Sequence, residues 1–232
     1  MRTIRAIFIK QARDTLKNRM TLVQFIIFPV MSFIMTTLVA KPAEDTPDSI
    51  FVTMFAAMFA GMTPLMMTNS AIAEDKEHKS LRFLVMAGVK PSQYLLGIGG
   101  FVLLSCSFVA VVFGLIGEFS GLELVKFVFI LILGSVASVV IGATVGIFSK
   151  NQQAATAIGT PVFMILAFLP MLSIFNDTIR DIANPLYTQQ VRMIVNESDM
   201  SITTEPLLII LANIAVAFIL FVLAYKKRGL KA

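Results

Sequence analysis

Six long apolar runs alternate with short polar segments along this chain of 232 residues. Each run has about 20 residues, the length at which an α-helix crosses a hydrocarbon core of about 30 Å. The strands of a membrane β-barrel would instead alternate polar and apolar residues in segments of about ten. We therefore expect an all-α polytopic membrane protein, a single transmembrane domain over 1–232, with spans at 22–40, 50–73, 94–117, 127–148, 154–175 and 207–225.

Three segments outside the spans carry patterns of their own. Residues 1–20 place Ile4, Phe8, Ala12 and Leu16 at helical spacing beside basic residues, while Ile7 falls outside this stripe. This pattern predicts an amphipathic elbow helix on the inner membrane face, and a simple topogenic anchor is the alternative. The loop at 176–205 is long and semi-polar, so we expect one or two short outer or re-entrant helices between the fifth and sixth spans.

Composition and charge agree with a membrane protein and orient it. The chain is 57% hydrophobic and 14% charged, with a mean hydropathy of +0.85, whereas about a quarter of the residues of a soluble domain are charged. With both termini inside, fifteen of the nineteen basic residues fall on the cytoplasmic side. The four on the outer side are Lys41, Lys126, Arg180 and Arg192. The positive-inside rule therefore places both termini in the cytoplasm, and we assign the basic excess to topology and lipid contact rather than to nucleic acid.

The side chains needed for catalysis or metal binding are scarce. His78 is the single histidine and Cys106 the single cysteine, which leaves a metal site or an intramembrane protease without its ligands. A Gly-rich nucleotide loop of the Walker type does not occur. Ion-coupled carriers usually hold charges deep within their spans, and none lie there in this sequence. These observations favour an apolar or amphipathic cargo moved by a motor on another chain.

The inner loop at 74–93 carries the strongest local signal. An acidic and basic cluster, Glu74–Lys79, precedes Leu81, Leu84 and Val85, which fall on one helical face. Pro91 then breaks the chain, and Ser92 is expected to cap the third span. An ordinary inner loop would be short and basic, so this pattern predicts a cytoplasmic docking helix.

The same loop resembles the signature of type-2 ABC transporter permeases. The matching parts are the acidic end of the second span at Glu74–Glu77, the helix around Leu81–Leu84, the break at Pro91-Ser92 and the restart at Leu95-Leu96-Gly97. Two further matches follow in order: the polar inner turn Ser149–Ala154, and the outer segment Asn184-Pro185-Leu186-Tyr187 with Arg192, which has one residue fewer before its Tyr. Arg82 departs from the family pattern, because an acidic residue is usual there.

This resemblance implies a non-catalytic permease subunit of a bacterial exporter in the cytoplasmic membrane. It implies a coupling helix that contacts a cytoplasmic ABC ATPase through Glu74, Asp75, Glu77, His78, Leu81, Arg82 and Leu84. It also implies an outer gate motif at Asn184, Pro185, Tyr187 and Arg192. The expected partners are that ATPase, the lipid bilayer and a second permease subunit, identical or paralogous. ATP and Mg²⁺ would bind to the partner ATPase, and no cofactor would bind to this chain.

The fourth span carries a stripe of small residues at every fourth position: Gly134, Ser138, Gly142 and Gly146. Such a stripe lets another helix approach closely. We expect it to serve packing within the subunit, although the same physics would serve packing between subunits.

The cargo is less constrained than the class. An uncharged interior and the absence of a large outer domain favour an amphipathic peptide, a peptide toxin or a hydrophobic drug, with a lipid or polysaccharide as the alternative. A non-transporting scaffold or sensor with the same fold is the other alternative.

Overall fold

The computed structural model describes residues 2–42, 47, 49–196, 200 and 203–226, and every regular element in that part of the chain is helical. The first half comprises α1 (Arg2–Lys17), α2 (Arg19–Met35), the π-helical η1 (Thr36–Ala40), α3 (Ile50–Glu77), α4 (Ser80–Met86) and α5 (Pro91–Ile116). The second half comprises α6 (Gly121–Phe148), α7 (Gln152–Leu172), α8 (Asp177–Ala183), α9 (Tyr187–Asn196) and α10 (Thr204–Ala224).

Six of these helices are long and apolar enough to cross a membrane, which confirms the predicted all-α architecture. They are α2 with η1, α3, α5, α6, α7 and α10. The helices differ from the predicted spans at their ends, most of all where α3 continues to Glu77 and α6 begins at Gly121. An apolar pattern marks only the part of a helix inside the hydrocarbon, whereas the backbone hydrogen bonds continue into the polar interface.

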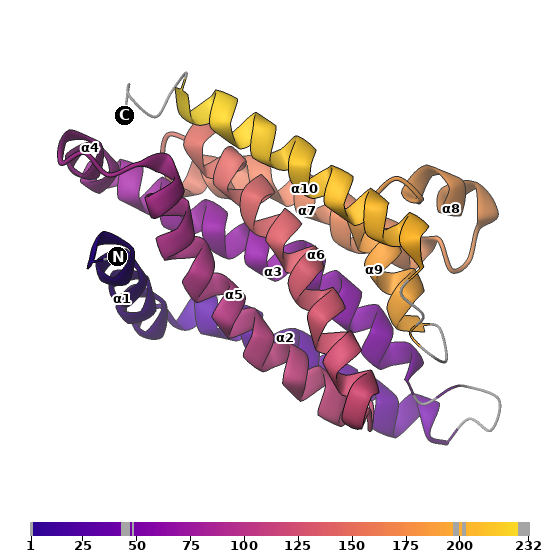
Figure 1. Cartoon of the computed structure of the whole chain (residues 1–232). Coiled ribbons are helices and arrows are strands. Elements are labelled where there is room, and N and C mark those ends of the chain that lie inside the picture. Colours follow the sequence, from indigo (N-terminus) through magenta and orange to yellow (C-terminus); the bar gives the residue numbers. More distant parts are fainter. Residues whose placement is uncertain (1, 43–46, 48, 197–199, 201–202, 227–232) are drawn as a thin grey trace.

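The bundle is arranged around α3, most of which is buried between its neighbours α2, α5, α6, α7 and α9. Helices α1 and α4 lie at one end of the bundle, and α8 lies at the opposite end (Figure 1). The described chain begins and ends near α4 (Figure 1). A chain with six spans crosses the bundle an even number of times, so its two ends lie at the same end of the bundle.

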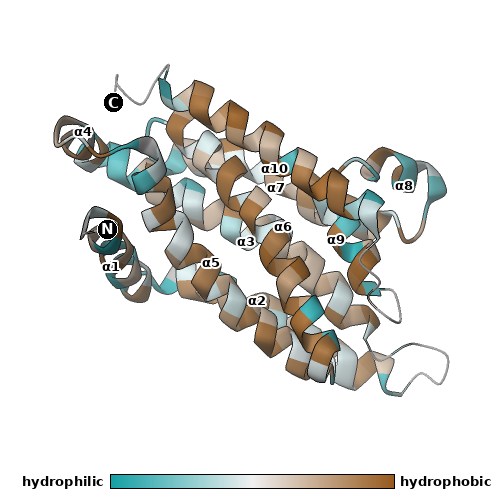
Figure 2. Ribbon diagram, in the orientation of Figure 1, coloured by the Kyte–Doolittle hydropathy of each residue, from teal (hydrophilic) through white to brown (hydrophobic). Residues whose placement is uncertain are grey.

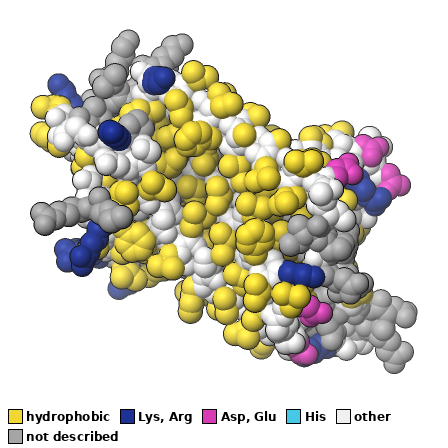
Figure 3. Space-filling view, in the orientation of Figure 1, with side chains coloured by type: hydrophobic (Ala, Val, Ile, Leu, Met, Phe, Trp, Pro, Cys, Tyr) yellow, Lys and Arg dark blue, Asp and Glu magenta, His cyan; other side chains and the backbone are white. Residues whose placement is uncertain are grey.

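The surface of the bundle is divided along its long axis. Hydrophobic residues dominate the spanning helices, and polar residues gather at the two ends (Figure 2). On the face drawn in Figure 3, most Lys and Arg side chains lie at the end with α1 and α4, and the Asp and Glu side chains lie at the other end. This polarity agrees with the charge asymmetry of the sequence.

The buried face of α1 differs from the predicted stripe. Ile7 is 5% exposed, whereas Leu16 is 69% exposed. Ile7 packs against α5 at Gly97, where an added Cβ would lie 2.6 Å from the Ile7 Cγ2 atom. Phe8 also meets α5, edge-on to Phe101 with ring centroids 5.6 Å apart. The predicted stripe is therefore not the buried face of α1. Ile7, which lies outside the stripe, is buried against α5, whereas Leu16, which belongs to the stripe, is exposed.

The small-residue stripe of α6 lies against other helices of the same chain. A Cβ added at Gly142 would lie 2.2 Å from the backbone oxygen of Leu65 in α3, and one at Gly146 would lie 2.9 Å from that of Asn69. Gly134 meets Val191 of α9 in the same way, at 2.7 Å from its Cγ2 atom. Ser138 donates a hydrogen bond to the backbone oxygen of Ala60. These contacts bring the backbones of α3 and α6 close together.

Candidate functional site

Helix α4 follows a tight turn at the end of α3. His78 follows the last residue of α3, and its N–H donates to the backbone oxygen of Glu74 at 3.0 Å, while the Lys79 N–H donates to that of Lys76 at 3.0 Å. Lys79 then adopts a left-handed conformation with φ of 59°, which is a common way to terminate a helix. After α4, Gly88 has φ of 78°, a conformation that glycine adopts without steric cost. These two turns place α4 as a separate short helix between two spans.

The two sides of α4 have different surroundings. Leu81 is 1% exposed, and Leu84 is partly buried against the same hydrophobic core. Phe83 and Met86 point away from the bundle and are 67% and 73% exposed, while Arg82 is also exposed. The apolar side predicted for docking therefore anchors α4 to its own chain. Helical periodicity identifies a face that is buried, but it does not tell which partner buries it.

The third span begins without the predicted serine cap. Its N-cap is Lys90 rather than Ser92, and Pro91 occupies the first helical turn. The side chain of Gln93 accepts a hydrogen bond from the backbone N–H of Lys90 at 3.2 Å. Ser92 is exposed on this turn. The expectation that Ser92 caps the helix is thus corrected, since the helix starts at Pro91 and leaves Ser92 inside it.

A buried carboxylate joins three helices beside α4. Asp75, near the end of α3, is 3% exposed. It accepts hydrogen bonds from the ammonium group of Lys10 on α1 and, at 2.7 Å, from the hydroxyl group of Tyr94 on α5. Lys10 also lies 3.4 Å from Asp14. We call Lys10, Asp75 and Tyr94 the elbow cluster. Sequence reasoning grouped Asp75 with the exposed acids of the loop, because no local pattern pairs it with residues so far along the chain.

The electrostatics of the elbow cluster hold Lys10 in its charged form. Burial by itself lowers the pKa of Lys10, but its hydrogen bond and charge interaction with Asp75, with a smaller effect of Asp14, raise that pKa above the usual value of 10.5. On the alkaline side the attraction therefore persists from neutral pH up to 10.5 and is lost as the pH rises through the raised pKa of folded Lys10. At neutral pH the ion pair is fully formed.

The other charges of the predicted cluster serve the ends of neighbouring helices. Glu77 accepts a hydrogen bond from the backbone N–H of Gln152 at 3.1 Å, at the start of α7. A carboxylate is favourable at this positive end of a helix. Lys76 donates to the backbone oxygens of Ile147 and Ser149, the latter at 2.7 Å, at the end of α6. The acidic and basic cluster therefore ties α3 to α6 and α7.

A polar cavity of about 160 Å³ lies among α1, α2, α3 and α7 close to the elbow cluster. Its lining includes Glu74 and Asp14, with the amide side chains of Gln11, Asn18, Gln24 and Gln152. Of the acidic residues predicted to contact an ATPase, Glu74 faces this cavity, Asp75 is buried and Glu77 is exposed. Among the described residues, no group of His, Cys, Asp and Glu side chains could hold a metal ion.

At the opposite end, the outer segment folds into α8 and the more deeply placed α9. Helix α9 packs against α3, α6, α7 and α10. Tyr187 is fully buried, and its hydroxyl group pairs with the Ser138 hydroxyl group. Because Ser138 already donates to Ala60, Tyr187 is the donor of this bond. The turn before α9 is tied to α10 by the side chain of Asn213, which donates to the backbone oxygen of Pro185 at 2.9 Å.

Arg192 projects from α9 toward α7. Its guanidinium donates to the Ser173 hydroxyl group at 3.2 Å and to the Gln189 side-chain oxygen at 3.4 Å. Burial, followed by the nearby charge of Arg180, lowers the pKa of Arg192, although a guanidinium remains charged at neutral pH. The backbone oxygen of Asn184 accepts a hydrogen bond from the Gln190 side chain. The four residues predicted as an outer gate motif thus lie together around α8 and α9.

The fold and these two ends define a polytopic helical membrane protein, with the short helix α4 at one end and the buried helix α9 at the other. Comparison with protein families matches residues 4–224 to the ABC-2 family transporter protein family. The chain therefore belongs to that family and is an ABC transporter permease subunit. Such a permease is non-catalytic, binds no cofactor itself and pairs with an ATPase subunit that supplies ATP hydrolysis. A search of curated proteins found no match.

Proposed function

We propose that α4 is the coupling helix through which a cytoplasmic ABC ATPase drives this permease. The observation that carries the proposal is the exposed pair Phe83 and Met86 on a short helix outside the spans. Large apolar side chains within a ring of charges are typical of the centre of a protein interface. Arg82, exposed beside Phe83, contributes a rim charge that favours one partner over another.

The contact surface that we propose combines α4 with exposed charges of the preceding turn. His78 and Glu77 are exposed and lie on that turn, so they remain candidates for ATPase contact. Leu81 and Asp75 are buried, and Leu84 packs on the hydrophobic core. These three residues therefore support the contact surface from beneath rather than form part of it. Glu74 lies on the polar cavity beside it.

The elbow cluster can transmit a displacement of α4 to the membrane-spanning helices. Helix α4 is continuous in sequence with α3 and α5, and Asp75 of α3 binds α1 through Lys10 and α5 through Tyr94. A displacement of α4 would therefore move the inner ends of these helices together. We propose that the outer segment around Tyr187 and Arg192 forms the outer gate, because α9 fills the opposite end of the bundle.

We place the protein in a bacterial cytoplasmic membrane with both termini and α4 in the cytoplasm. The basic end of the bundle supports this orientation (Figure 3). Six spans form half of the usual transport unit of this class, so a second permease subunit, identical or paralogous, would complete it.

Substitution of the exposed apolar pair of α4 should remove the ATPase. We expect the double variant Phe83→Asp and Met86→Asp to reduce ATPase recovered with the full-length permease, purified in mild detergent, by at least about tenfold. Two carboxylates at the centre of a small interface would be desolvated without a partner. The measurement is the ratio of the two chains after affinity purification and size-exclusion chromatography.

The matched control is Phe175→Asp, because Phe175 is an exposed aromatic residue just after α7, at the opposite end of the bundle. This variant should keep the wild-type ratio of the two chains. An unchanged ratio in the α4 variant, with a normal elution profile, would refute the docking assignment.

For the cargo, we propose an amphipathic peptide, a peptide toxin or a hydrophobic drug, exported from the cytoplasm. The charged residues of the spans lie within two turns of their ends, so the middle of the spans offers no fixed charge to bind an ionic group. We expect ATP hydrolysis by the reconstituted complex to rise with amphipathic peptides or hydrophobic drugs. Stimulation by polysaccharide or lipid alone would reject this cargo class, and an ATPase that binds without stimulation by any of these cargoes would favour a scaffold.

A further inference from the structure

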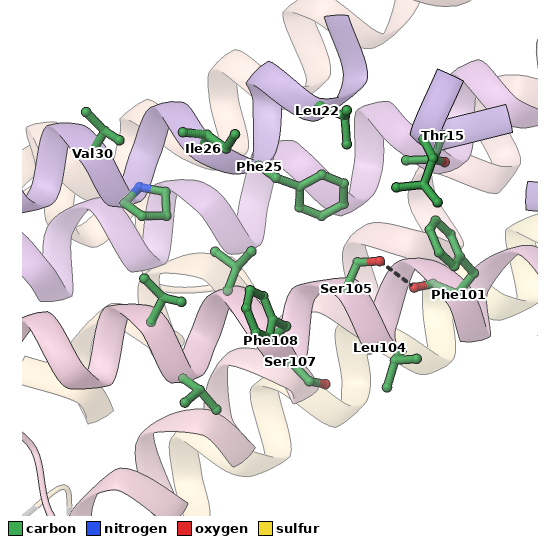
Figure 4. A pocket seen from close by; sticks show the side chains of 15 residues that line it. Thr15, Leu22, Phe25, Ile26, Val30, Phe101, Leu104, Ser105, Ser107 and Phe108 are labelled. Carbon is green, nitrogen blue, oxygen red and sulfur yellow. Dashed lines mark hydrogen bonds between the residues drawn. The ribbon is translucent and has the colours of Figure 1, made fainter. Parts of the chain in front are cut away.

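A groove of about 940 Å³ lies between α2 and α5. One wall is formed by Leu22, Phe25 and Val30 of α2, and the other by Phe101 and Phe108 of α5 (Figure 4). Thr15 and Leu16, at the end of α1, form its inner mouth. Because both walls are membrane-spanning helices, the groove lies at the depth of the hydrocarbon.

The groove suits a hydrocarbon occupant rather than a polar one. Two hydroxyl groups in its lining are used within α5, since Ser105 donates to the backbone oxygen of Phe101 at 3.0 Å and Ser107 donates to that of Leu103 at 2.7 Å. The first of these bonds is drawn in Figure 4. A serine that bonds its own helix offers little to a polar ligand. The remaining lining is almost entirely aliphatic and aromatic.

The length of the groove matches one leaflet of the bilayer. On α5 it runs from Phe101 to Val112, about 16 Å at the rise of an α-helix. On α2 it ends at Val30, near the middle of the span Thr21–Ala40. Half of a hydrocarbon core is about 15 Å thick. The α2 wall therefore covers the inner half of its span, whereas the α5 wall lies across the middle and outer part of Ser92–Ile116. The groove starts at the inner mouth and crosses the centre of the membrane over about the length of one acyl chain.

The inner mouth of the groove is positively charged. Lys17 follows Leu16, Arg19 begins α2, and both residues are exposed. Of the acidic groups nearby, Asp14 is paired with Lys10, and both Asp14 and Glu74 line the separate polar cavity. Basic residues at the cytoplasmic ends of membrane helices attract anionic lipid headgroups.

We propose that this groove binds one anionic phospholipid of the cytoplasmic leaflet, with an acyl chain along Phe25, Phe101 and Phe108 and the phosphate between Lys17 and Arg19. The site is not part of the ATPase contact, and no residue of the elbow cluster lines it. Such a lipid would fill the space between the first and third spans and hold the turn between α1 and α2 at the level of the headgroups.

The chain contains no tryptophan, so a single inserted tryptophan reports on its own surroundings. Phe108→Trp places the reporter in the groove. Phe218→Trp places it on the outside of α10, where Phe218 is exposed and lies close to the inner end of the span. Each full-length variant is reconstituted in nanodiscs of equal phosphatidylcholine and phosphatidylglycerol, with bromine on the acyl chains of only one of the two lipids.

We expect brominated phosphatidylglycerol to quench the tryptophan fluorescence of the F108W protein at least about twofold more than brominated phosphatidylcholine does. The two brominated lipids should quench the fluorescence of the F218W protein to the same extent. Adding Lys17→Gln and Arg19→Gln should abolish the preference, whereas Lys17→Arg with Arg19→Lys should keep it. Equal quenching by both lipids in the F108W protein would overturn the proposal in favour of unselective lipid. Weak quenching by both would overturn it in favour of a second copy of the chain. The measurement needs neither ATPase nor cargo, so its failure would leave the proposed function unaffected.

Discussion

Replacing Gly142 with alanine is expected to destabilise the bundle more than any other single methyl group added to it. The new Cβ would lie 2.2 Å from the backbone oxygen of Leu65 and 2.9 Å from its carbonyl carbon. Backbone atoms cannot rotate away as a side chain can, so α3 and α6 would have to separate. Overpacking of a close-packed interior usually costs about 1–3 kcal/mol, and we expect this substitution to reach the upper end of that range.

The separation would extend beyond Gly142, because α3 is the helix on which most of the other spans pack. The measurement is the thermal midpoint of the detergent-purified protein, followed by size-exclusion chromatography. The matched control is Gly100→Ala in α5, where the nearest atom to an added Cβ is 3.9 Å away. That variant should be neutral or slightly more stable, since alanine favours a helix over glycine. Equal stability of the two variants would contradict the close approach of α3 and α6.

Removal of the charge of Asp75 should weaken both the fold and the coupling of the transporter. Asp75→Asn keeps the shape of the side chain but removes the ion pair with Lys10, while its oxygen can still accept a bond from Tyr94. A buried hydrogen bond to a charged group contributes about 1.5–3 kcal/mol, so we expect a loss of about 2 kcal/mol. The thermal midpoint and the ATPase activity of the assembled complex should both fall.

The control for Asp75 uses the same lysine. Asp14→Asn removes the other carboxylate near Lys10, which lies 3.4 Å away and is much more exposed, and exposed pairs of this kind contribute at most about 0.5 kcal/mol. The stability difference between wild type and D75N should be constant from neutral pH to pH 10.5. It should shrink as the pH rises further, because Lys10 loses its charge as the pH passes through its raised pKa. If D14N and D75N are equally stable, the elbow cluster does not hold the three helices together.

The sequence placed Gly142 on a packing stripe without showing which helix it meets, and it did not reveal the partners of Asp75. The periodic pattern of the second half of the inner loop predicted a short helix with an apolar face, and α4 carries that face at Leu81 and Leu84. The same pattern could not show whether the ATPase or the permease itself covers the face. Likewise, the spacing of Ile4, Phe8, Ala12 and Leu16 predicted a helix, yet the position of α5 decided that Ile7 is buried and Leu16 is not.

The sequence by itself determined the class of architecture and predicted an orientation, because neither depends on which helices become neighbours. About 20 apolar residues suffice to place a helix across a bilayer, and an excess of Lys and Arg suffices to orient it. The motifs around Glu74–Gly97 were sufficient to identify the resemblance to ABC permeases, and the match over residues 4–224 established the family.

The tertiary structure alone decided which side chains meet across the helices. It joined Lys10 to Asp75 and Tyr94, placed Gly142 against the backbone of Leu65, and opened the groove between α2 and α5. Hydrophobic burial is non-directional, so a pattern of apolar residues states that a face is covered without naming what covers it. Hydrogen bonds, ion pairs and close packing depend instead on positions to within an ångström. Those positions follow from how all of the helices pack together.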